Sequence, residues 1–333
     1  DADRRRRPVV RQQPVIAAPV IAAPVIAALD WGTTRLRLWL LDAAGAVIAG
    51  RRSDDGLTSA QEAGFSAVLE SHLAALGASE TLPVVACGMV GSRQGWVEAP
   101  YVDIPARIDT ILKGAARVPG ERRDIRIVPG LAQRLAEAPD VMRGEETQLA
   151  GAGLPAEGRH LACMPGTHSK WVEITDGAVA GFGTWPTGEL FSLLATHSIL
   201  RHSLGETPAA VGADNACFRQ SCASALAEGG DITARLFSIR AATLLQGLAP
   251  ADAAATLSGL LIGAEIASAL RRYGRPDGAI TLIAAGALGL LYQCALDLTG
   301  LPFRLVDAEQ AVRAGLFAAA SRNGMIATTE PSA

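Results

Sequence analysis

From Val25 onward, short apolar runs alternate with polar turns along the chain. Val25–Leu29 and Leu36–Asp42 are apolar segments separated by a polar loop, and Ala46–Arg51 follows after the small residues Ala43 to Gly45. Apolar runs of this length between turn residues are typical of strands. The pattern therefore predicts a three-stranded meander.

Helices and strands alternate after this meander. Apolar residues at helical spacing predict a helix over Ala60–Leu76. Thr81–Cys87 and Arg126–Val128 are apolar enough to be further buried strands. A meander followed by alternating helices and strands is the order expected of a ribonuclease-H-like lobe.

The second half of the chain repeats this theme. The predicted strands are Leu161–Met164, Ser169–Thr175, Ala178–Thr184 and Ala279–Ala284, with Asp176-Gly177 as a two-residue hairpin turn. The predicted helices are Gly188–His197, Ala234–Leu245, Ala255–Arg272 and Leu288–Leu298. The expectation is an α/β protein with a duplicated ribonuclease-H-like (actin-like ATPase) fold. Its two lobes, residues 25–150 and 151–333, would enclose an interlobe cleft.

Residues 14–28 read PVIAA three times, a period that fits neither a solenoid repeat nor a heptad. Only the last copy leads directly into Leu29-Asp30, so only that copy is predicted to form a core strand. Pro14, Pro19 and Pro24 would remove hydrogen bonds from a sheet interior. Residues 1–24 are therefore expected to form an extended or disordered tail.

Composition narrows the functional classes. The net charge of -3 shows no basic excess, so we expect no nucleic-acid partner. The five cysteines are scattered without paired CxxC motifs, which favours reduced thiols in the cytoplasm over a zinc site. No uninterrupted apolar run of membrane-spanning length is present, so no membrane partner is expected. The sequence does not set the oligomeric state, and a homodimer is one state that it allows.

The first candidate loop, Asp30 to Thr34, follows the first predicted strand. Asp30 can orient a hydrated Mg²⁺, which prefers oxygen ligands and keeps several waters. Gly32 allows close approach of a phosphate to the backbone, and Thr33 and Thr34 add hydroxyl and amide donors. The alternative is a plain hairpin turn.

The second candidate loop lies at the equivalent place in the second half of the chain. Backbone and hydroxyl donors of this loop, with one lysine charge, suit the outer phosphates of a nucleotide. The histidine is equally well explained as a residue that holds the turn. No Walker-type GxxxxGK[ST] motif occurs, which argues against a P-loop kinase. The residues are Gly166, Thr167, His168, Ser169 and Lys170.

Acidic residues precede the second loop by about one helix, in the segment Asp140 to Gln148. Glu145 or Glu146 is a candidate for the base that takes a proton from an attacking hydroxyl. The alternative is ordinary acidic charge at the start of a helix, which the helix dipole favours.

The segment Cys87 to Trp96 is a candidate substrate loop. Its glycines free the backbone for a small ligand, and its arginine can pair with a substrate carboxylate. A surface salt bridge is the alternative for that arginine. The candidate residues are Gly88, Met89, Ser92, Arg93, Gln94 and Trp96. Farther on, the small residues around Gly286 follow a strand and either accommodate an adenosine or pack a helix.

Taken together, these segments resemble the 2-dehydro-3-deoxygalactonokinases, a family of the actin-like sugar-kinase superfamily. The resemblance extends from about Ala28 to about Phe317, and RGEET and PGTHSKW are its most specific motifs. The other matching stretches are LDWGTTRLRLWLLD, CGMVGSRQGWVEAPYV, IVPGL, TGELFSLLATHSIL and SGLLIGAE.

The resemblance implies ATP- and Mg²⁺-dependent phosphorylation of 2-dehydro-3-deoxy-D-galactonate at its terminal (6-) hydroxyl. Asp30 to Thr34 and Gly166 to Ser169 would be the two phosphate loops, and Gly286 would lie in the adenosine segment. Related kinases carry a Gly-Asp pair as catalytic base where this chain has Gly144-Glu145, so Glu146 and Asp140 stay open as alternatives. The competing functions are a kinase of another sugar acid or ketose on the same fold and a non-catalytic actin-like nucleotide-binding protein.

Overall fold

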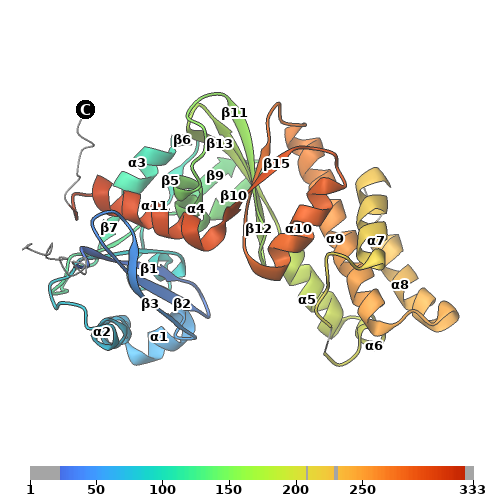
Figure 1. Cartoon of the computed structure of the whole chain (residues 1–333), viewed down its shortest axis with the longest axis horizontal. Helices are drawn as coiled ribbons and strands as arrows, with labels where there is room; N and C mark the ends of the chain where they lie inside the picture. The colour runs from blue at the N-terminus through green and yellow to red at the C-terminus, as the bar shows by residue number, and fades with distance from the viewer. Residues whose placement is uncertain (1–22, 208, 229–231, 327–333) are drawn as a thin grey trace, which may run out of the picture.

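The computed structural model describes residues 23–326, except 208 and 229–231. The tail expected over residues 1–24 lies outside this range apart from its last two residues. Within the described range, two similar sheets lie in two halves of the molecule, and the C-terminal helix α11 (Ala308–Arg322) runs alongside both (Figure 1).

The first sheet has six strands in the order β3-β2-β1-β4-β8-β7. Its strands are β1 (Ile26–Trp31), β2 (Leu36–Leu41), β3 (Val47–Ser53), β4 (Val84–Cys87), β7 (Ala116–Arg117) and β8 (Ile125–Ile127). β1 pairs antiparallel with β2, as the predicted meander requires, and it pairs parallel with β4 on its other side.

Both faces of β1 are covered, because successive side chains of a strand point to opposite sides. Ala27, Leu29 and Trp31 pack in one core cluster with α2 (Phe65–Ala75). Ile26 and Ala28 pack in another cluster with α11. The helix predicted as continuous over Ala60–Leu76 is instead two helices, because Gly64 between α1 (Leu57–Ala63) and α2 has a φ of 90°.

The second sheet has the order β15-β14-β11-β12-β13-β6. Read in the opposite direction, its strands β13-β12-β11-β14-β15 correspond to β3-β2-β1-β4-β8 of the first sheet. This repetition confirms the duplicated ribonuclease-H-like, actin-like architecture. The Asp176-Gly177 turn is confirmed as well, with both residues at positive φ between β12 and β13. The strands are β11 (Arg159–Met164), β12 (Ser169–Thr175), β13 (Ala178–Trp185), β14 (Ile280–Ala284), β15 (Phe303–Asp307) and β6 (Ala106–Arg107).

Helices gather on the outer side of the second half (Figure 1). They are α5 (Thr187–His197), α6 (Arg201–Leu204), α7 (Ala216–Glu228), α8 (Ile232–Gln246), α9 (Pro250–Tyr273) and α10 (Gly286–Asp297). Among the described residues, α9 has the length and apolar character of a membrane span, but 83% of its apolar window is buried inside the protein, as in a core helix. Its SGLLIGAE segment packs on α7, where a Cβ at Gly259 would lie 2.3 Å from the Phe218 carbonyl oxygen.

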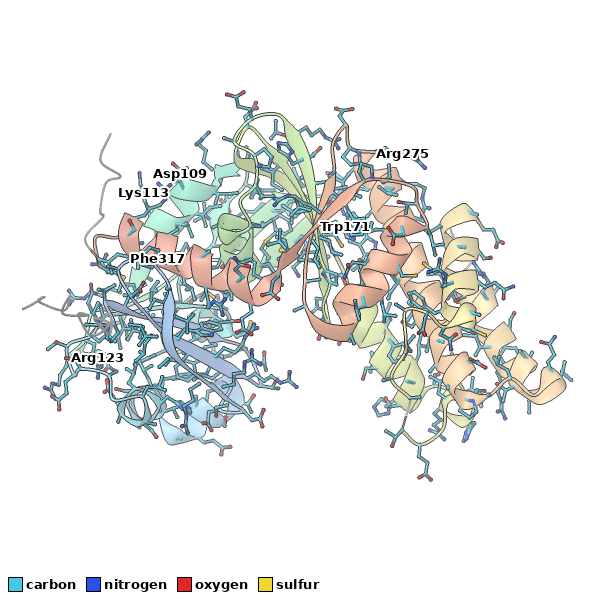
Figure 2. All side chains as sticks on the ribbon, in the orientation of Figure 1. Asp109, Lys113, Arg123, Trp171, Arg275 and Phe317 are labelled. Carbon is cyan, nitrogen blue, oxygen red and sulfur yellow. The ribbon has the colours of Figure 1, made fainter. Side chains whose placement is uncertain are left out.

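Two segments pack across the boundary expected near residue 150. β6 adds an edge strand to the second sheet, and α11 packs against β1 of the first sheet. Phe317 of α11, labelled in Figure 2, lies against the turn at Gly45 between β2 and β3. The remaining elements near this junction are η1 (Met89–Gly91), β5 (Val102–Asp103), α3 (Ile108–Lys113), β9 (Leu131–Leu135), β10 (Ala138–Met142) and α4 (Glu145–Gly151).

Glycines allow α4 and α11 to pack backbone against backbone. A Cβ at Gly315 would lie 1.9 Å from the Thr147 carbonyl oxygen, and a Cβ at Gly151 would lie 1.9 Å from the Ala311 carbonyl oxygen. Separations this short exclude any side chain, so the two helices must move apart if either glycine is replaced.

We predict that Gly315→Ala lowers the free energy of unfolding by about 1–3 kcal/mol, because the added methyl overpacks this contact. Urea denaturation measures the change. Gly278→Ala is the control, since a Cβ there meets open space at an ordinary φ. Equal stability of the two variants would contradict this account of the α4–α11 contact.

Candidate active site

Asp30 lies at the end of β1 and lines a cavity of about 1080 Å³. Its Oδ2 accepts a hydrogen bond from the Arg37 guanidinium, and the two side chains form an ion pair. Burial raises the pKa of Asp30, and the neighbouring Arg37 charge opposes that rise. The carboxylate thus sits in a poorly solvated place with one close counter-charge.

Two glycines bring another segment against Asp30. Gly88, directly after β4, has a φ of 92°, and a Cβ there would lie 2.8 Å from the Trp31 carbonyl oxygen and 3.4 Å from Asp30 Oδ1. Gly144, directly before α4, has a φ of 110°, and a Cβ there would lie 3.5 Å from the Gly88 Cα. The start of α4 therefore lies near the end of β1, and the positive φ at both positions favours glycine.

Glu145 is the first residue of α4, and its carboxylate contacts both halves of the molecule. Oε2 accepts a hydrogen bond from the Arg143 backbone N–H at 3.1 Å, and Oε1 lies 3.8 Å from Nζ of Lys170 at the start of β12. Burial raises the pKa of Glu145, whereas the Lys170 charge lowers it. A carboxylate in such surroundings is suited to accept a proton near neutral pH.

Glu146 is turned away from the cleft and is only 2% exposed. Its carboxylate accepts hydrogen bonds from the Gly144 backbone N–H at 2.7 Å and from the Thr147 hydroxyl at 2.9 Å. Burial, reinforced by the charge of Glu145, raises the pKa of Glu146 to about 8. These contacts occupy the Glu146 side chain locally, whereas the Glu145 side chain is partly exposed and lies beside Lys170.

The structure places Asp140 away from the start of α4. This residue belongs to strand β10 rather than to the start of a helix, and its Oδ1 accepts a hydrogen bond from the Thr184 hydroxyl on β13 at 2.7 Å. Burial raises the pKa of Tyr273, the last residue of α9, to about 12, and the charge of Asp140 adds to that rise. Pro139 obscured this strand in the sequence, because proline argues against a strand in a sheet interior and is tolerated only at an edge strand or a bulge.

The second candidate loop divides into an exposed part and a buried part. Thr167 and His168 are exposed, and His168 Nε2 lies 2.9 Å from the Glu189 carboxylate. Ser169 is fully buried, and its hydroxyl bonds the Tyr292 hydroxyl at 3.0 Å. The Ser169 hydroxyl therefore faces the core rather than the solvent. The Gly166 N–H also points inward, to Ser169 Oγ at 3.4 Å.

The first loop and the residue Gly286 face a common cavity of about 1080 Å³. Gly32 lines it, while Thr33 and Thr34 are exposed in the same turn. Gly286 stands at the start of α10 with a φ of 61°. The charged residues that line this cavity are Asp30, Arg35, Arg37, Arg52, Asp54, Asp307, Glu309 and Arg313.

The donor set of the cavity fits a hydrated Mg²⁺ better than a fully protein-ligated metal. Asp30, Asp307 and Glu309 supply carboxylate oxygens, the ligand type that Mg²⁺ prefers. Within residues 23–326, apart from the gaps at 208 and 229–231, no three His, Cys, Asp or Glu side chains form a metal-binding group. One carboxylate with waters and ligand phosphates is the usual arrangement for this ion.

A second, apolar cavity of about 270 Å³ adjoins the second loop. Gly166, Thr187 and Gly188 line one side, and Leu288 and Tyr292 of α10 line another. Its volume lies just below the range of about 300–1,000 Å³ for sites that enclose a whole drug-sized ligand, so it suits a single ring system.

The arginine of the candidate substrate loop lies at the surface. The Arg93 side chain is 85% exposed and lies 3.7 Å from Glu98, the surface salt bridge that the sequence left open. Gln94 is exposed, and its carbonyl oxygen accepts a hydrogen bond from Gln61. Trp96 stacks on Phe65 at 6.0 Å and belongs to the edge of the core. Met89 begins η1 directly after Gly88.

Arg143, which the sequence analysis did not select, lies beside this loop. Its Nη2 donates to the Ala99 carbonyl oxygen at 2.8 Å, and its guanidinium lies 4.4 Å from the centre of the Tyr101 ring. Nε and Nη1 of Arg143 and the hydroxyl of Ser92 are buried without a hydrogen-bond partner. A Cβ at Gly91 would lie 3.0 Å from Nη1, so these unpaired groups border the same glycine. The only sequence signal was the place of Arg143 directly before Gly144-Glu145.

Comparison with known proteins assigns this arrangement to a family. The profile of the 2-keto-3-deoxy-galactonokinase family matches residues 30–319. The chain belongs to this family. The same range contains every candidate residue described above, from Asp30 to Gly286.

Two relatives of the same family align with this chain over nearly their whole length. A Rhizobium meliloti (strain 1021) protein assigned as 2-dehydro-3-deoxygalactonokinase DgoK1 is 52% identical over 88% of this chain and 95% of its own length. The 2-dehydro-3-deoxygalactonokinase of Escherichia coli (strain K12) is 37% identical over 87% of this chain and 95% of its own length.

A solved structure shows the same fold within the family. A crystal structure from Sinorhizobium meliloti, assigned to 2-dehydro-3-deoxygalactonokinase, matches with a TM-score of 0.85 and 52% identity. The match covers 89% of this chain and 98% of that one. The family resemblance stated from the sequence motifs is therefore confirmed.

We predict that replacing Glu146 in this kinase changes how its stability depends on pH. The raised pKa means that the folded state favours protonated Glu146, so wild-type stability falls as pH rises from about 4.5 to about 8. Glu146→Gln removes this titration, and the fall should be smaller by up to about 1.4 kcal/mol per pH unit. Urea unfolding at pH 5, 7 and 9 measures both proteins. Parallel pH profiles for the two proteins would show that Glu146 is not held protonated.

Proposed function

We propose that this chain transfers the γ-phosphate of ATP to the terminal (6-) hydroxyl of 2-dehydro-3-deoxy-D-galactonate. The observation that carries the proposal is the meeting of Asp30, Glu145 and Lys170 from the two halves of the fold, beside a cavity that both halves line. A phosphoryl-transfer site needs positioned charge around the phosphates and a base at the acceptor hydroxyl. This meeting point supplies both in one place.

The phosphates would lie between the two loops. Gly32, Thr33 and Thr34 would present backbone and hydroxyl donors from the first half of the chain. From the second half, the exposed residues Thr167 and His168 would face the phosphates at the loop tip. Lys170 would contribute charge, and Gly166 and Gly286 would allow close approach of the nucleotide. Asp30 would hold the Mg²⁺ through water, and the ion would neutralise charge on the ATP phosphates when bound.

Glu145 would be the base of the transfer. The terminal hydroxyl oxygen forms the new bond to the γ-phosphorus as the bond from that phosphorus to the bridging oxygen of ADP breaks, and the hydroxyl proton passes to Glu145. Burial supports this role because it raises the affinity of Glu145 for a proton. Lys170 keeps the carboxylate ionised until the proton arrives and fixes its direction.

Arg143 and Ser92 would recognise the carboxylate end of the sugar acid. Their unpaired donors border Gly91. Gly91 lies in the loop that begins at Gly88, next to Asp30. A buried donor without a partner costs about 1–3 kcal/mol, and an incoming carboxylate would remove that cost. In this proposal Arg143 takes the role that the sequence analysis assigned to Arg93.

The apolar cavity beside Gly166 would hold the adenine ring. Leu288 and Leu291 of α10 would cover the ring face, and Gly286 stands at the start of the same helix. This arrangement directs the ribose and phosphates from α10 toward the second loop. The five free cysteines of the described residues agree with a cytoplasmic location for the kinase.

Coupled ADP release with Mg-ATP tests the function directly. The assay compares 2-dehydro-3-deoxy-D-galactonate with its gluconate epimer and with no sugar acid. We expect strong turnover only with the galactonate compound. Equal rates with both epimers would broaden the substrate to sugar acids in general. ADP release that ignores both compounds would move the function to a non-catalytic or ATPase role of the same fold.

We predict that Glu145→Gln lowers kcat by about 10²–10⁴-fold, because the amide cannot take the hydroxyl proton. Glu146→Gln is the matched control, since it removes the neighbouring carboxylate that the structure turns away from the cleft. Its kcat should stay within a few-fold of wild type. Similar kcat losses for both variants, with unfolding curves unchanged, would remove Glu145 from the role of base.

We predict that Arg143→Lys raises KM for the sugar acid by about 10–100-fold, because lysine keeps the charge but lacks the planar fork of donors. KM for ATP should change less than about threefold. Arg93→Lys is the control at the exposed arginine of the same loop. A large rise in KM for the Arg93 variant and none for the Arg143 variant would restore the assignment made from the sequence.

A further inference from the structure

Glu265 is a buried carboxylate in the middle of the C-terminal half. It lies on α9 and is only 2% exposed. Three side chains donate hydrogen bonds to it: Trp171 Nε1 at 2.8 Å, the Tyr292 hydroxyl at 2.6 Å and the Thr187 hydroxyl. Trp171, labelled in Figure 2, lies where the second sheet meets these helices. The three donors come from β12, α10 and α5, so a single carboxylate joins three elements to α9.

When Glu265 is ionised, the hydrogen bonds around it have only one consistent direction. An ionised carboxylate can only accept, so the Tyr292 hydroxyl donates to Glu265 and must accept from the Ser169 hydroxyl. Ser169 Oγ in turn accepts from the Gly166 backbone N–H. A directed chain of hydrogen bonds thus runs from the second phosphate loop to Glu265.

The same carboxylate supports the elements on either side of that loop. Thr187 begins α5, and the next residue, Gly188, lies so close to the loop that a Cβ there would be 2.6 Å from the Gly166 carbonyl oxygen. The Glu189 backbone N–H donates to the Thr167 carbonyl oxygen at 3.0 Å. Thr187 and Tyr292 also line the apolar cavity beside Gly166. Removing the carboxylate would therefore loosen the loop and two walls of the cavity together.

Simple packing does not explain an acid at this place. Taking a carboxylate out of water costs several kcal/mol, and an apolar residue of similar volume usually packs without that cost. Buried carboxylates are retained where they fix the positions of several donors. Two of the three donors, Thr187 and Tyr292, line the candidate nucleotide cavity.

We propose that Glu265 is a positioning residue that sets the second phosphate loop and the adjoining apolar cavity in the geometry that binds ATP. The inference rests on the proposed kinase function. Glu265 acts through Ser169, Thr187 and Tyr292 and touches neither substrate nor nucleotide. Loss of its charge should weaken nucleotide binding while leaving the sugar-acid side of the cleft, which lies in the other half of the chain, unaffected.

Two variants test the role. Glu265→Gln keeps the volume but turns a hydrogen-bond donor toward hydroxyls that already donate. Tyr292→Phe removes the hydroxyl that links Ser169 to Glu265. Glu173→Gln is the control, because it removes a carboxylate from the same strand, β12, where Glu173 pairs with Arg159 away from the cleft. The readouts are KM for ATP, KM for the sugar acid, kcat, and Kd for ADP by calorimetry.

We expect Glu265→Gln and Tyr292→Phe to raise both KM for ATP and Kd for ADP by about tenfold, the loss expected for one strong hydrogen bond. KM for the sugar acid should stay within about twofold, and Glu173→Gln should match wild type in every constant. If Glu265→Gln does not fold, Tyr292→Phe decides alone.

Unchanged ADP binding in the folded variants, or equal losses in the Glu173 control, would overturn the positioning role. A fall in kcat with unchanged KM for ATP and Kd for ADP would overturn it as well. These outcomes differ from failure of the kinase proposal itself, in which the wild-type protein would show no transfer to any sugar acid.

Discussion

The approach of Gly144 to Gly88 places the start of α4 beside the end of β1. Both residues have positive φ, a conformation that side-chain-bearing residues rarely adopt, and a Cβ at Gly88 would also lie 2.8 Å from the Trp31 carbonyl oxygen. Glu145 then stands beside Asp30, and Lys170 of the second half of the fold reaches it. The close packing of α4 on α11 at Gly151 and Gly315 holds α4 in this position.

The charged partners of Asp30, Glu145 and Glu146 distinguish these three acids from one another. Asp30, Glu145 and Glu146 are all poorly solvated, and burial raises the pKa of each. Their partners differ in kind. Arg37 and Lys170 supply full charges to Asp30 and Glu145, whereas Glu146 has only a backbone N–H and a hydroxyl. The acid without a counter-charge is therefore the one with a pKa near 8, and the two acids with counter-charges face the cleft.

Much of this fold could be predicted from local sequence, because the strands of both meanders are apolar runs with clear turn residues. The bounds of β12 and the Asp176-Gly177 turn follow directly from these patterns. The short edge strands β5, β6 and β7 could not be predicted, since two residues carry no periodicity. The return of α11 to the first sheet is a tertiary contact that no local pattern specifies.

The candidate site shows the same division between local and tertiary information. Asp30, Gly88 and Gly144-Glu145 could be located because each follows or precedes an element with a clear pattern. The sequence could not show which of Arg93 and Arg143 has a buried guanidinium. It also could not show whether the Ser169 hydroxyl points to the cavity or to the core. Both follow from packing against residues distant in sequence, such as Ala99 and Tyr292.

The role of Glu145 as the base is tested most directly by a crystal structure with a non-hydrolysable ATP analogue, Mg²⁺ and 2-dehydro-3-deoxy-D-galactonate. We expect the terminal hydroxyl of the sugar acid to lie within hydrogen-bond reach of Glu145, at about 2.6–3.2 Å, and in line with the γ-phosphate. We also expect the metal-bound water to contact Asp30. A terminal hydroxyl placed beside another side chain, or a sugar acid bound outside the junction of Gly88 and Gly144, would contradict this role.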